Sequence, residues 1–578
     1  MRTERDLAER LRAIDRRGYP AYKSLRGVYD LGGLELSVDH VQGDPFAAPS
    51  QVSVMLPAAR AGFPGELFDA PHRRVALEDL LVRRFARAAA RVSFAVGGSG
   101  KSGLIATSRP GPEVLPRSAC SVGADGSVTL RLEAGLPAHG RTVDGRAAAR
   151  MLLDLIPSCA EEALVCTPRV GREARAAADL ADDRRFVREE LVRRGLVAFV
   201  ADGSVLPRES GVSSRPMEGA RPFTSPESMR VVLDLPHRGP TPGMGVRRGV
   251  TLIVGGGYHG KSTLLRALQE GVYDHVAGDG RELVVTDAAA VKLRAEDGRP
   301  VRETDISLFI GELPDGRDTA RFTTADASGS TSQAAAVVEA LDAGSRVLLV
   351  DEDTSATNFM VRDALMEAVV SGGDEPITPF VERVRDLWER AGVSCVIVAG
   401  SSGAFFSVAD TVVQMDRYEA RDITDRVRAV CRELGAPDTP RAPRFSEPGP
   451  GRRLTWGVAE RRGRGRGGRT ARDGREQRVR ARSHGLDGVE VGGGSADLRL
   501  VEQLVDPEQT AALAQMMRSA AHLGLLDGSH TAAEAVRAVF GRLDEGGWEA
   551  VSEHGEAACG LALPRPQELY ALLARWRG

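Results

Sequence analysis

The stretch VTLIVGGGYHGKSTLLRAL, residues 250–268, decides the fold. An apolar run precedes Gly-Gly-Gly-Tyr-His-Gly-Lys-Ser, which fits the pattern G-x-x-x-x-G-K-[ST], and a helical pattern follows it. In this context glycines let backbone amides turn toward phosphates, Lys261 can reach the β and γ phosphates, and Ser262 can ligate Mg²⁺. A glycine-rich turn without a ligand is the alternative. The predicted phosphate-binding residues are Gly255, Gly256, Gly257, Tyr258, His259, Gly260, Lys261, Ser262 and Thr263.

A second apolar run ends in two acidic residues, Asp351 and Glu352. Ligands of α/β sheets lie at the carboxyl ends of the strands, so both carboxylates are expected to face the phosphates. Asp351 can hold Mg²⁺ through its water shell, and Glu352 can polarise the attacking water. The predicted catalytic residues are therefore Glu352 and Lys261, and the predicted metal ligands are Ser262 and Asp351. Solvated acids after a strand are the alternative.

A serine-rich segment, Ala-Ser-Gly-Ser-Thr-Ser-Gln at residues 327–333, lies between these two motifs. Its Ser328 precedes Asp351 by 23 residues. Alone, the segment would be an ordinary helix start. Between the other two motifs it resembles the signature of ABC ATPases, in which a Ser-Gly-Gly element opens a helix that leads to the acidic strand. Ser330 replaces the second glycine here.

The resemblance extends to a particular family. The strings ADGSVLPRESG, GVTLIVGGGYHGKSTLL, GVYDHVAGDGREL, ASGSTSQAA and LLVDEDTSATNFMVRD look like the predicted ATPases of the ABC class, a stand-alone group distinct from transporters. They cover residues 200–425 densely, and VQGDPFAAPS and VEQLVDPEQ extend the likeness toward both ends.

This resemblance implies an ATP- and Mg²⁺-dependent ATPase that acts as a homodimer. It implies that Ser328, Gly329 and Ser330 contact the γ-phosphate bound to the opposite subunit. The resemblance also implies a link to RNA, which favours a nucleic-acid partner. The alternatives are an ATP-gated nucleic-acid-binding switch with little turnover, and a nucleotide-binding subunit of a transporter.

Two departures from the general ABC pattern concern turnover. Gly400 stands where a switch histidine would follow the strand at 394–399, and no clear glutamine marks the usual Q-loop around residues 305–307. Hydrolysis is therefore expected to be slow or differently gated.

The chain of 578 residues is too long for one core and predicts several domains. We expect a mixed α+β domain at 1–195, an α/β core of the ABC type at 196–435, a Pro/Gly/Arg-rich linker or arm at 436–484, and a small helical domain at 485–578. Short apolar runs at 250–254, 346–350 and 394–399 are typical of strands buried on both faces.

Composition excludes several classes of protein. The formal charge of -3 gives no overall attraction to nucleic acid or membrane, and the six cysteines show no zinc-ligand or redox spacing. The N-terminus is charged rather than signal-like, and no run approaches the length of a membrane span. The sequence predicts a cytoplasmic protein without a membrane partner.

Two further segments carry positive charge. Gly-Gly-Ser-Gly-Lys-Ser at 97–102 contains Lys101, one of only four lysines, and follows the run VSFAV, which reads as a strand. A second ATP site, an accessory phosphate or RNA contact, and a structural turn are its three interpretations. The arginine-rich segment 461–482 can neutralise phosphates without sequence preference, or serve as a solvated linker.

Overall fold

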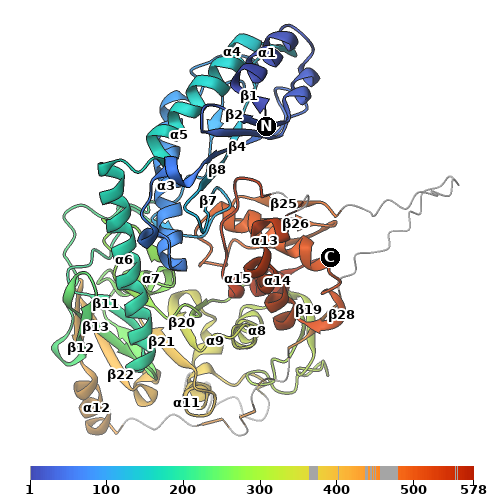
Figure 1. Cartoon of the computed structure of the whole chain (residues 1–578). Helices are drawn as coiled ribbons and strands as arrows, with labels where there is room; N and C mark the ends of the chain where they lie inside the picture. The colour runs from blue at the N-terminus through green and yellow to red at the C-terminus, as the bar shows by residue number, and fades with distance from the viewer. Residues whose placement is uncertain are drawn as a thin grey trace, which may run out of the picture. The chain divides into compact units, whose positions relative to one another are not determined.

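The computed structural model describes residues 2–362, 375–400, 402–435, 441–442, 445–446, 448, 451–455, 479–552, 555 and 557–578. The chain divides into two compact units (Figure 1). The first comprises Met1–Arg185 and His554–Leu563, and the second comprises Phe186–Glu553 and Pro564–Gly578. The domain boundaries expected at 195, 435 and 484 stay predictions.

The first unit is a sheet covered by helices. Its strands follow the order β1-β2-β3-β4-β8-β5, with β7 also paired to β8; β1 runs parallel to β2 and the other pairs are antiparallel. Buried and half-buried residues alternate along β4, as expected of a strand with one face on the core. Its main elements are β1 (Arg2–Thr3), α1 (Glu4–Ile14), β2 (Gly27–Asp30), β3 (Glu35–His40), β4 (Ser50–Leu56), α3 (Pro71–Val92), β5 (Ile105–Ala106), β7 (Cys120–Val122), β8 (Val128–Ala134), α4 (Gly145–Ala149) and α5 (Ile156–Leu164).

The spacing of Leu7, Leu11 and Ile14 in an otherwise charged segment predicts an N-terminal helix. Helix α1 confirms it, and these three are its buried residues. The strand predicted at VSFAV is wrong. Helix α3 continues through Val92, and Phe94 then takes a left-handed φ of 63°. An apolar run that ends a long helix is not distinguished from a strand by its composition.

The second unit contains a six-stranded sheet in the order β17-β20-β21-β14-β22-β23. Successive pairs are parallel except β22 with β23. The three buried strands predicted from sequence are confirmed and lie at its centre. The strands are β14 (Val250–Val254), β17 (Val291–Leu293), β20 (Val347–Asp351), β21 (Ser394–Val398), β22 (Thr411–Asp416) and β23 (Glu419–Asp422).

Helices cover this sheet on both faces. Leu348 and Ile397 belong to the hydrophobic cluster formed with α8 (Gly329–Asp342) and α11 (Phe380–Ala391). Neighbouring residues along the same strands point to the opposite face, where α7 (Lys261–Glu270) packs against β20 and β21. This is the layered arrangement of an α/β fold, as the sequence predicts.

The C-terminal part of this unit combines the predicted helices with strands that the sequence did not reveal. In the sequence, Asp506 with Gln509 and Thr531 with Glu534 predict capping boxes, and these boxes begin α13 and α14. The elements of this part are β24 (Arg453–Thr455), β25 (Ala481–His484), β26 (Gly488–Val491), β27 (Gly494–Asp497), α13 (Pro507–His522), β28 (Asp527–Thr531), α14 (Ala532–Gly546) and α15 (Pro566–Arg575). The short strands 481–497 are polar and glycine-rich, which hides their period of two.

Further elements of the second unit lie along the chain between α6 and β20. Helix α6 (Pro168–Arg193) leads from the first unit into the second. The others are a sheet in the order β12-β13-β11-β16 and a hairpin, formed by β11 (Leu196–Ala201), β12 (Arg230–Leu235), β13 (Gly239–Arg247), β16 (Val284–Thr286), β18 (Arg299–Thr304) and β19 (Phe322–Ala327).

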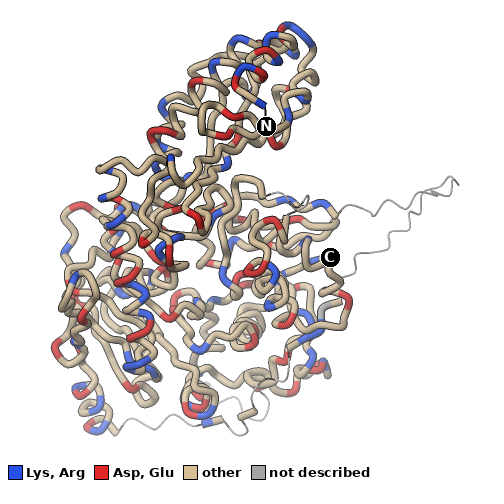
Figure 2. Tube along the Cα trace, in the orientation of Figure 1, with Lys and Arg blue, Asp and Glu red and all other residues tan. Residues whose placement is uncertain are grey.

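Figure 2 shows positive and negative residues interspersed along both units, in keeping with the near-neutral charge. Within the described part of the chain, no helix has the length and apolarity that crossing a membrane requires.

Candidate functional site

Three loops meet at one edge of the six-stranded sheet. Ile253 near the end of β14 and Asp351 at the end of β20 both pair with Val398, the last residue of β21, so the three strands end level. Residues 255–260 follow β14, Glu352 follows β20 and Gly400 lies two residues beyond β21. The carboxyl edge of the sheet therefore collects both predicted motifs, as such edges do in open α/β folds.

The loop 255–260 turns sharply before α7 begins at Lys261. Gly260 has a φ of +98°, and Gly255 has a φ of +142° at a point where a side chain would clash with the carbonyl oxygen of Met415. Glycine is therefore required at both positions. The Nζ atom of Lys261 donates to the carbonyl oxygens of Gly255 (2.7 Å) and Gly256 (3.0 Å), which curls the side chain over the loop. A strand, a glycine turn and a helix N-terminus are the parts of a phosphate-binding loop.

The turn between β22 and β23 holds this loop from the side, a contact that sequence reasoning missed. The amide of Tyr418 donates to the carbonyl oxygen of His259 (3.1 Å), and His259 Nδ1 lies 3.2 Å from a carboxylate oxygen of Asp416. Arg417 and Tyr418 both have left-handed φ values, of 49° and 67°. Two adjacent non-glycine residues in this conformation could not be predicted from sequence. Tyr258 lies on the outer side of the loop and is 99% exposed.

Glu352 and Lys261 converge on Gly400. The Gly400 amide donates a hydrogen bond of 2.6 Å to the Oε2 atom of Glu352. A Cβ atom placed on Gly400 would lie 3.9 Å from that oxygen and 4.0 Å from Cε of Lys261. The residue at the switch position therefore contacts the predicted hydrolytic carboxylate through its backbone, and no side chain is needed for this contact.

Asp351 and Ser262 offer oxygen atoms for a cation. Asp351 is 7% exposed, and burial raises the pKa of its carboxyl group. Ser262 lies in the first turn of α7, beside Lys261. A hydroxyl and a carboxylate are the ligands that Mg²⁺ uses together with substrate phosphates, so these residues fit the predicted ion. The described residues contain no group of three or more His, Cys, Asp or Glu side chains that could hold a metal ion by itself.

The serine-rich segment begins α8, as the resemblance implies. The Ser328 hydroxyl caps this helix by accepting from the amide of Thr331, and Ser330 is buried. Among the described residues, no hydrogen bond or ion pair joins residues 328–330 to the loop 255–263 of the same chain. The structure thus brings Lys261, Glu352 and Asp351 to one edge but does not join the signature segment to them.

The second Gly-Lys-Ser segment, at 97–102, has a different architecture. The amide of Ser99 donates to the carbonyl of Ala138 (2.8 Å), and the amide of Lys101 donates to the carbonyl of Pro45 (2.9 Å). The Ser102 hydroxyl donates to the carbonyl of Ser99 (2.6 Å), and no α-helix begins at this segment. Because these groups are used within the protein, the geometry favours the structural turn over a phosphate site.

Most of the arginine-rich segment 461–482 lies outside the described residues, including Arg461, Arg462, Arg464, Arg466 and Arg469. Its described end contains Arg480, directly before β25, and Arg482, within that strand.

A parallel sheet with a phosphate loop after one strand and two carboxylates after another defines the class of P-loop nucleotide-binding domains. Comparison with known families then identifies the chain. Residues 171–447 match the P-loop domain of ABC ATPases, and residues 4–167 match the family described as ATPase of the ABC class N-terminal. Residues 480–578 match the MRB1590 C-terminal domain. The chain belongs to the stand-alone ATPases of the ABC class.

One curated relative and several solved structures are similar to parts of the chain. Uncharacterized protein MJ1628 of Methanocaldococcus jannaschii is 28% identical over 249 residues, which is 41% of this chain. The match spans about half of that relative, 54% of its length.

The solved structures are similar at low identity. They include cbiO1 from Clostridium perfringens, part of the cbiONQ ABC transporter complex, with 14% identity and a TM-score of 0.25 over 42% of this chain and 95% of that one. A bacterial Atm1-family ABC exporter with ATP bound has 16% identity and a TM-score of 0.25 over 52% of this chain and 54% of that one. The ADP conformation of MJ1267, an ATP-binding cassette of an ABC transporter, has 15% identity and a TM-score of 0.23 over 36% of this chain and 94% of that one.

Proposed function

We propose that this chain binds ATP with Mg²⁺ and hydrolyses it at the edge formed by Lys261, Glu352 and Gly400. The hydrogen bond from the Gly400 amide to Glu352 is the observation that carries the proposal. A carboxylate fixed beside a phosphate-binding lysine is suited to orient the attacking water. Lys261 would contact the β and γ phosphates, and Ser262 with Asp351 would hold the ion, which offsets phosphate charge.

Two substitutions at Gly400 test this proposal. Gly400→Ala keeps the amide and adds a Cβ at ordinary contact distances from Glu352 and Lys261, so we expect kcat for ATP within about threefold of wild type. Gly400→Pro removes the donor to a charged group, and we expect kcat to fall about 10- to 100-fold. Steady-state phosphate release with Mg²⁺ measures both. Equal kcat values for the two variants would remove the amide from the mechanism.

A homodimer with composite sites is part of the proposal. Each chain has one phosphate loop and one signature segment, and residues 328–330 have no hydrogen bond to the described loop of their own chain. The N-terminus of α8 supplies amides and a positive dipole end, which suits a γ-phosphate held by a second copy. Ser328, Gly329 and Ser330 would complete the partner's site.

Nucleic acid, RNA in particular, is the proposed partner of the arginine-rich segment. Its arginines alternate with glycines, which suits contact with phosphates rather than bases. We expect the full chain to bind a single-stranded RNA with an affinity that falls steeply with salt, and deletion of residues 456–478 to flatten that dependence. A filter-binding titration at several salt concentrations measures both proteins, and unchanged binding after deletion would contradict this role.

The cytoplasmic location stays a prediction.

A further inference from the structure

Lys292 is a lysine whose role neither the motifs nor the family match assigns. It lies in the middle of β17, beside the acidic strand β20. Its Nζ atom donates to the carbonyl oxygen of Leu293 (3.0 Å) and to the hydroxyl of Thr354 (3.1 Å). Both acceptors are uncharged. Burial lowers the pKa of this amine, while the nearby carboxylates of Glu502 and Asp351 oppose that shift.

The Lys292 side chain is connected to the turn that contains Glu352 by its hydrogen bond to Thr354. Residues Glu352–Thr354 form one short helical turn directly after β20. The Thr354 hydroxyl accepts from Lys292 and donates to the carbonyl oxygen of Asp351 (3.3 Å). The last residue of the turn, Thr354, is therefore bonded to Lys292 of β17, and the side chain of its first residue, Glu352, is bonded to the amide of Gly400.

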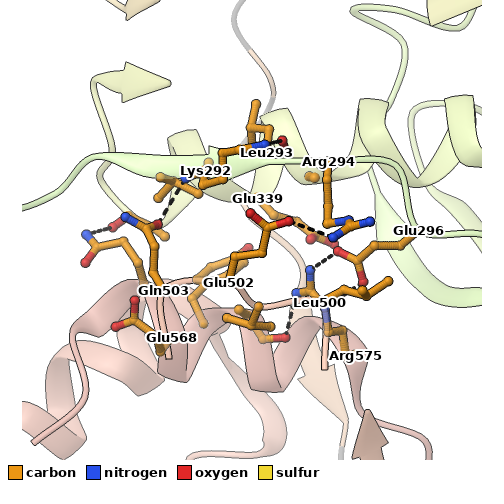
Figure 3. Close-up of a pocket in the computed structure, with 18 of the residues that line it drawn as sticks. Lys292, Leu293, Arg294, Glu296, Glu339, Leu500, Glu502, Gln503, Glu568 and Arg575 are labelled. Atoms are coloured by element: carbon orange, nitrogen blue, oxygen red, sulfur yellow. Dashed lines mark hydrogen bonds and ion pairs between the residues drawn. The ribbon is translucent and has the colours of Figure 1, made fainter. Parts of the chain in front are cut away.

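The strand that bears Lys292 is in turn held by the C-terminal part of the chain. The side chain of Gln503 is buried; its Oε1 accepts from the amide of Lys292 (3.0 Å), and its Nε2 donates to the carbonyl oxygens of Gln269 (3.1 Å) and Ala290 (3.2 Å). Figure 3 shows the side chain of Gln503 directed at Lys292, and both residues line the pocket drawn there. Gln269 belongs to α7, the helix that begins with Lys261. The side chain of Gln503 therefore connects β17, which contains Lys292, with the helix that follows the phosphate-binding loop.

The neighbouring residue adds to the same connection. The carbonyl oxygen of Glu502 accepts from Nε2 of Gln269 (2.8 Å), and its carboxylate pairs with Arg294, which follows β17 (2.6 Å). The Glu502 contacts are partly buried, whereas those of the Gln503 amide group to Gln269 and Ala290 are buried, and a buried hydrogen bond that loses its partner leaves a costly unpaired group. Residues 502–503 are therefore held in place by hydrogen bonds and an ion pair to the ATPase core.

We propose that Lys292 is a positioning residue for hydrolysis, which holds the turn bearing Glu352, and that Gln503 of the C-terminal part keeps Lys292 in place. This inference rests on the proposed ATPase function. It gives the C-terminal part a role in positioning the turn that contains Glu352 in the same chain. A lysine that served folding alone would change stability without separating turnover from binding.

Substitutions along this path test the inference. We expect Lys292→Met to lower kcat for ATP about 10- to 100-fold while KM and the Kd of a fluorescent ATP analogue stay within about threefold. Thr354→Val removes the acceptor with little change of shape, so it should lower kcat in the same direction. The double variant should be no slower than Lys292→Met, because both changes remove the same hydrogen bond between Lys292 and Thr354. Lys101→Met makes the same change at an exposed lysine of the first unit, and this control should match wild type.

A second pair of variants, Gln503→Leu and Gln567→Leu, tests the contact of the C-terminal part with β17. Gln503→Leu should lower kcat at least about threefold, since it releases the strand of Lys292. Gln567→Leu makes the same change in the same pocket, where Gln567 bonds only the carbonyl oxygen of Ala343 among its described contacts, and should leave kcat unchanged.

The outcomes distinguish a failure of this inference from a failure of the proposed ATPase function. If wild type hydrolyses ATP and Glu352→Gln does not, while Lys292→Met and Thr354→Val both match wild type, the inference alone is overturned. Parallel loss of analogue binding and melting temperature in both variants would also overturn it, because that pattern marks a purely structural lysine. A wild-type chain without turnover would overturn the function and the inference together.

Discussion

Replacing Glu352 with glutamine is expected to lower kcat for ATP hydrolysis by at least about 100-fold, the range typical of a lost general base. The amide keeps the size of the side chain and its acceptor toward Gly400, whose bond to Glu352 measures 2.6 Å in the wild type. It removes the negative charge that orients and polarises water. Phosphate release at saturating ATP and Mg²⁺ measures the change.

Nucleotide binding provides the control for this variant. Glu352→Gln should bind ATP within about threefold of wild type, because the loop 255–263 is untouched. We also expect ATP to hold the variant in a dimer, which light scattering would detect as a doubled mass. A variant that hydrolyses ATP at the wild-type rate would remove Glu352 from the catalytic role.

Loss of Lys261 is the second large effect. Lys261→Ala should raise the Kd of ATP about 10- to 100-fold, since a charge-assisted contact with phosphate contributes about 1.5–3 kcal/mol. In the wild-type structure the Nζ atom contacts carbonyl oxygens of Gly255 and Gly256, which keeps it over the loop. Titration with a fluorescent ATP analogue measures the affinity.

Lys101→Ala is the matched control, because Lys101 also lies in a Gly-Lys-Ser triplet. The amides of its loop are bonded to Pro45 and Ala138 instead of being available to a ligand. We expect its ATP affinity to equal that of wild type. An equal loss in both variants would mean that the loop 97–102 also binds the nucleotide.

The layered fold was largely predictable because its signals are local. Apolar runs at 250–254, 346–350 and 394–399 were recognisable as strands because both faces of each are buried. The caps at Asp506 and Thr531 were recognisable because a capping box lies within four residues. The run 92–96 failed for the same reason: a local apolar pattern does not say whether a helix or a strand bears it.

The contacts that complete the candidate site join distant residues and leave no such pattern. The bond between Gly400 and Glu352 uses a backbone amide, which every residue except proline has. Gln503 lies 211 residues from Lys292 and 234 from Gln269. The scarcity of lysine was the signal that could have singled out Lys292, since only Lys261 and Lys101 lie in a recognisable motif.

Mixing two inactive variants tests the composite ATPase site most directly. Lys261→Ala disables one phosphate loop, and Ser328→Glu places a negative charge where the partner's γ-phosphate would lie, at a helix N-terminus that tolerates an acidic residue. A mixed dimer contains one site with neither change. The account predicts that each variant alone is nearly inactive and that an equimolar mixture recovers roughly a quarter of wild-type phosphate release, the share expected when half the dimers are mixed and each has one intact site. A mixture no more active than its components would contradict it.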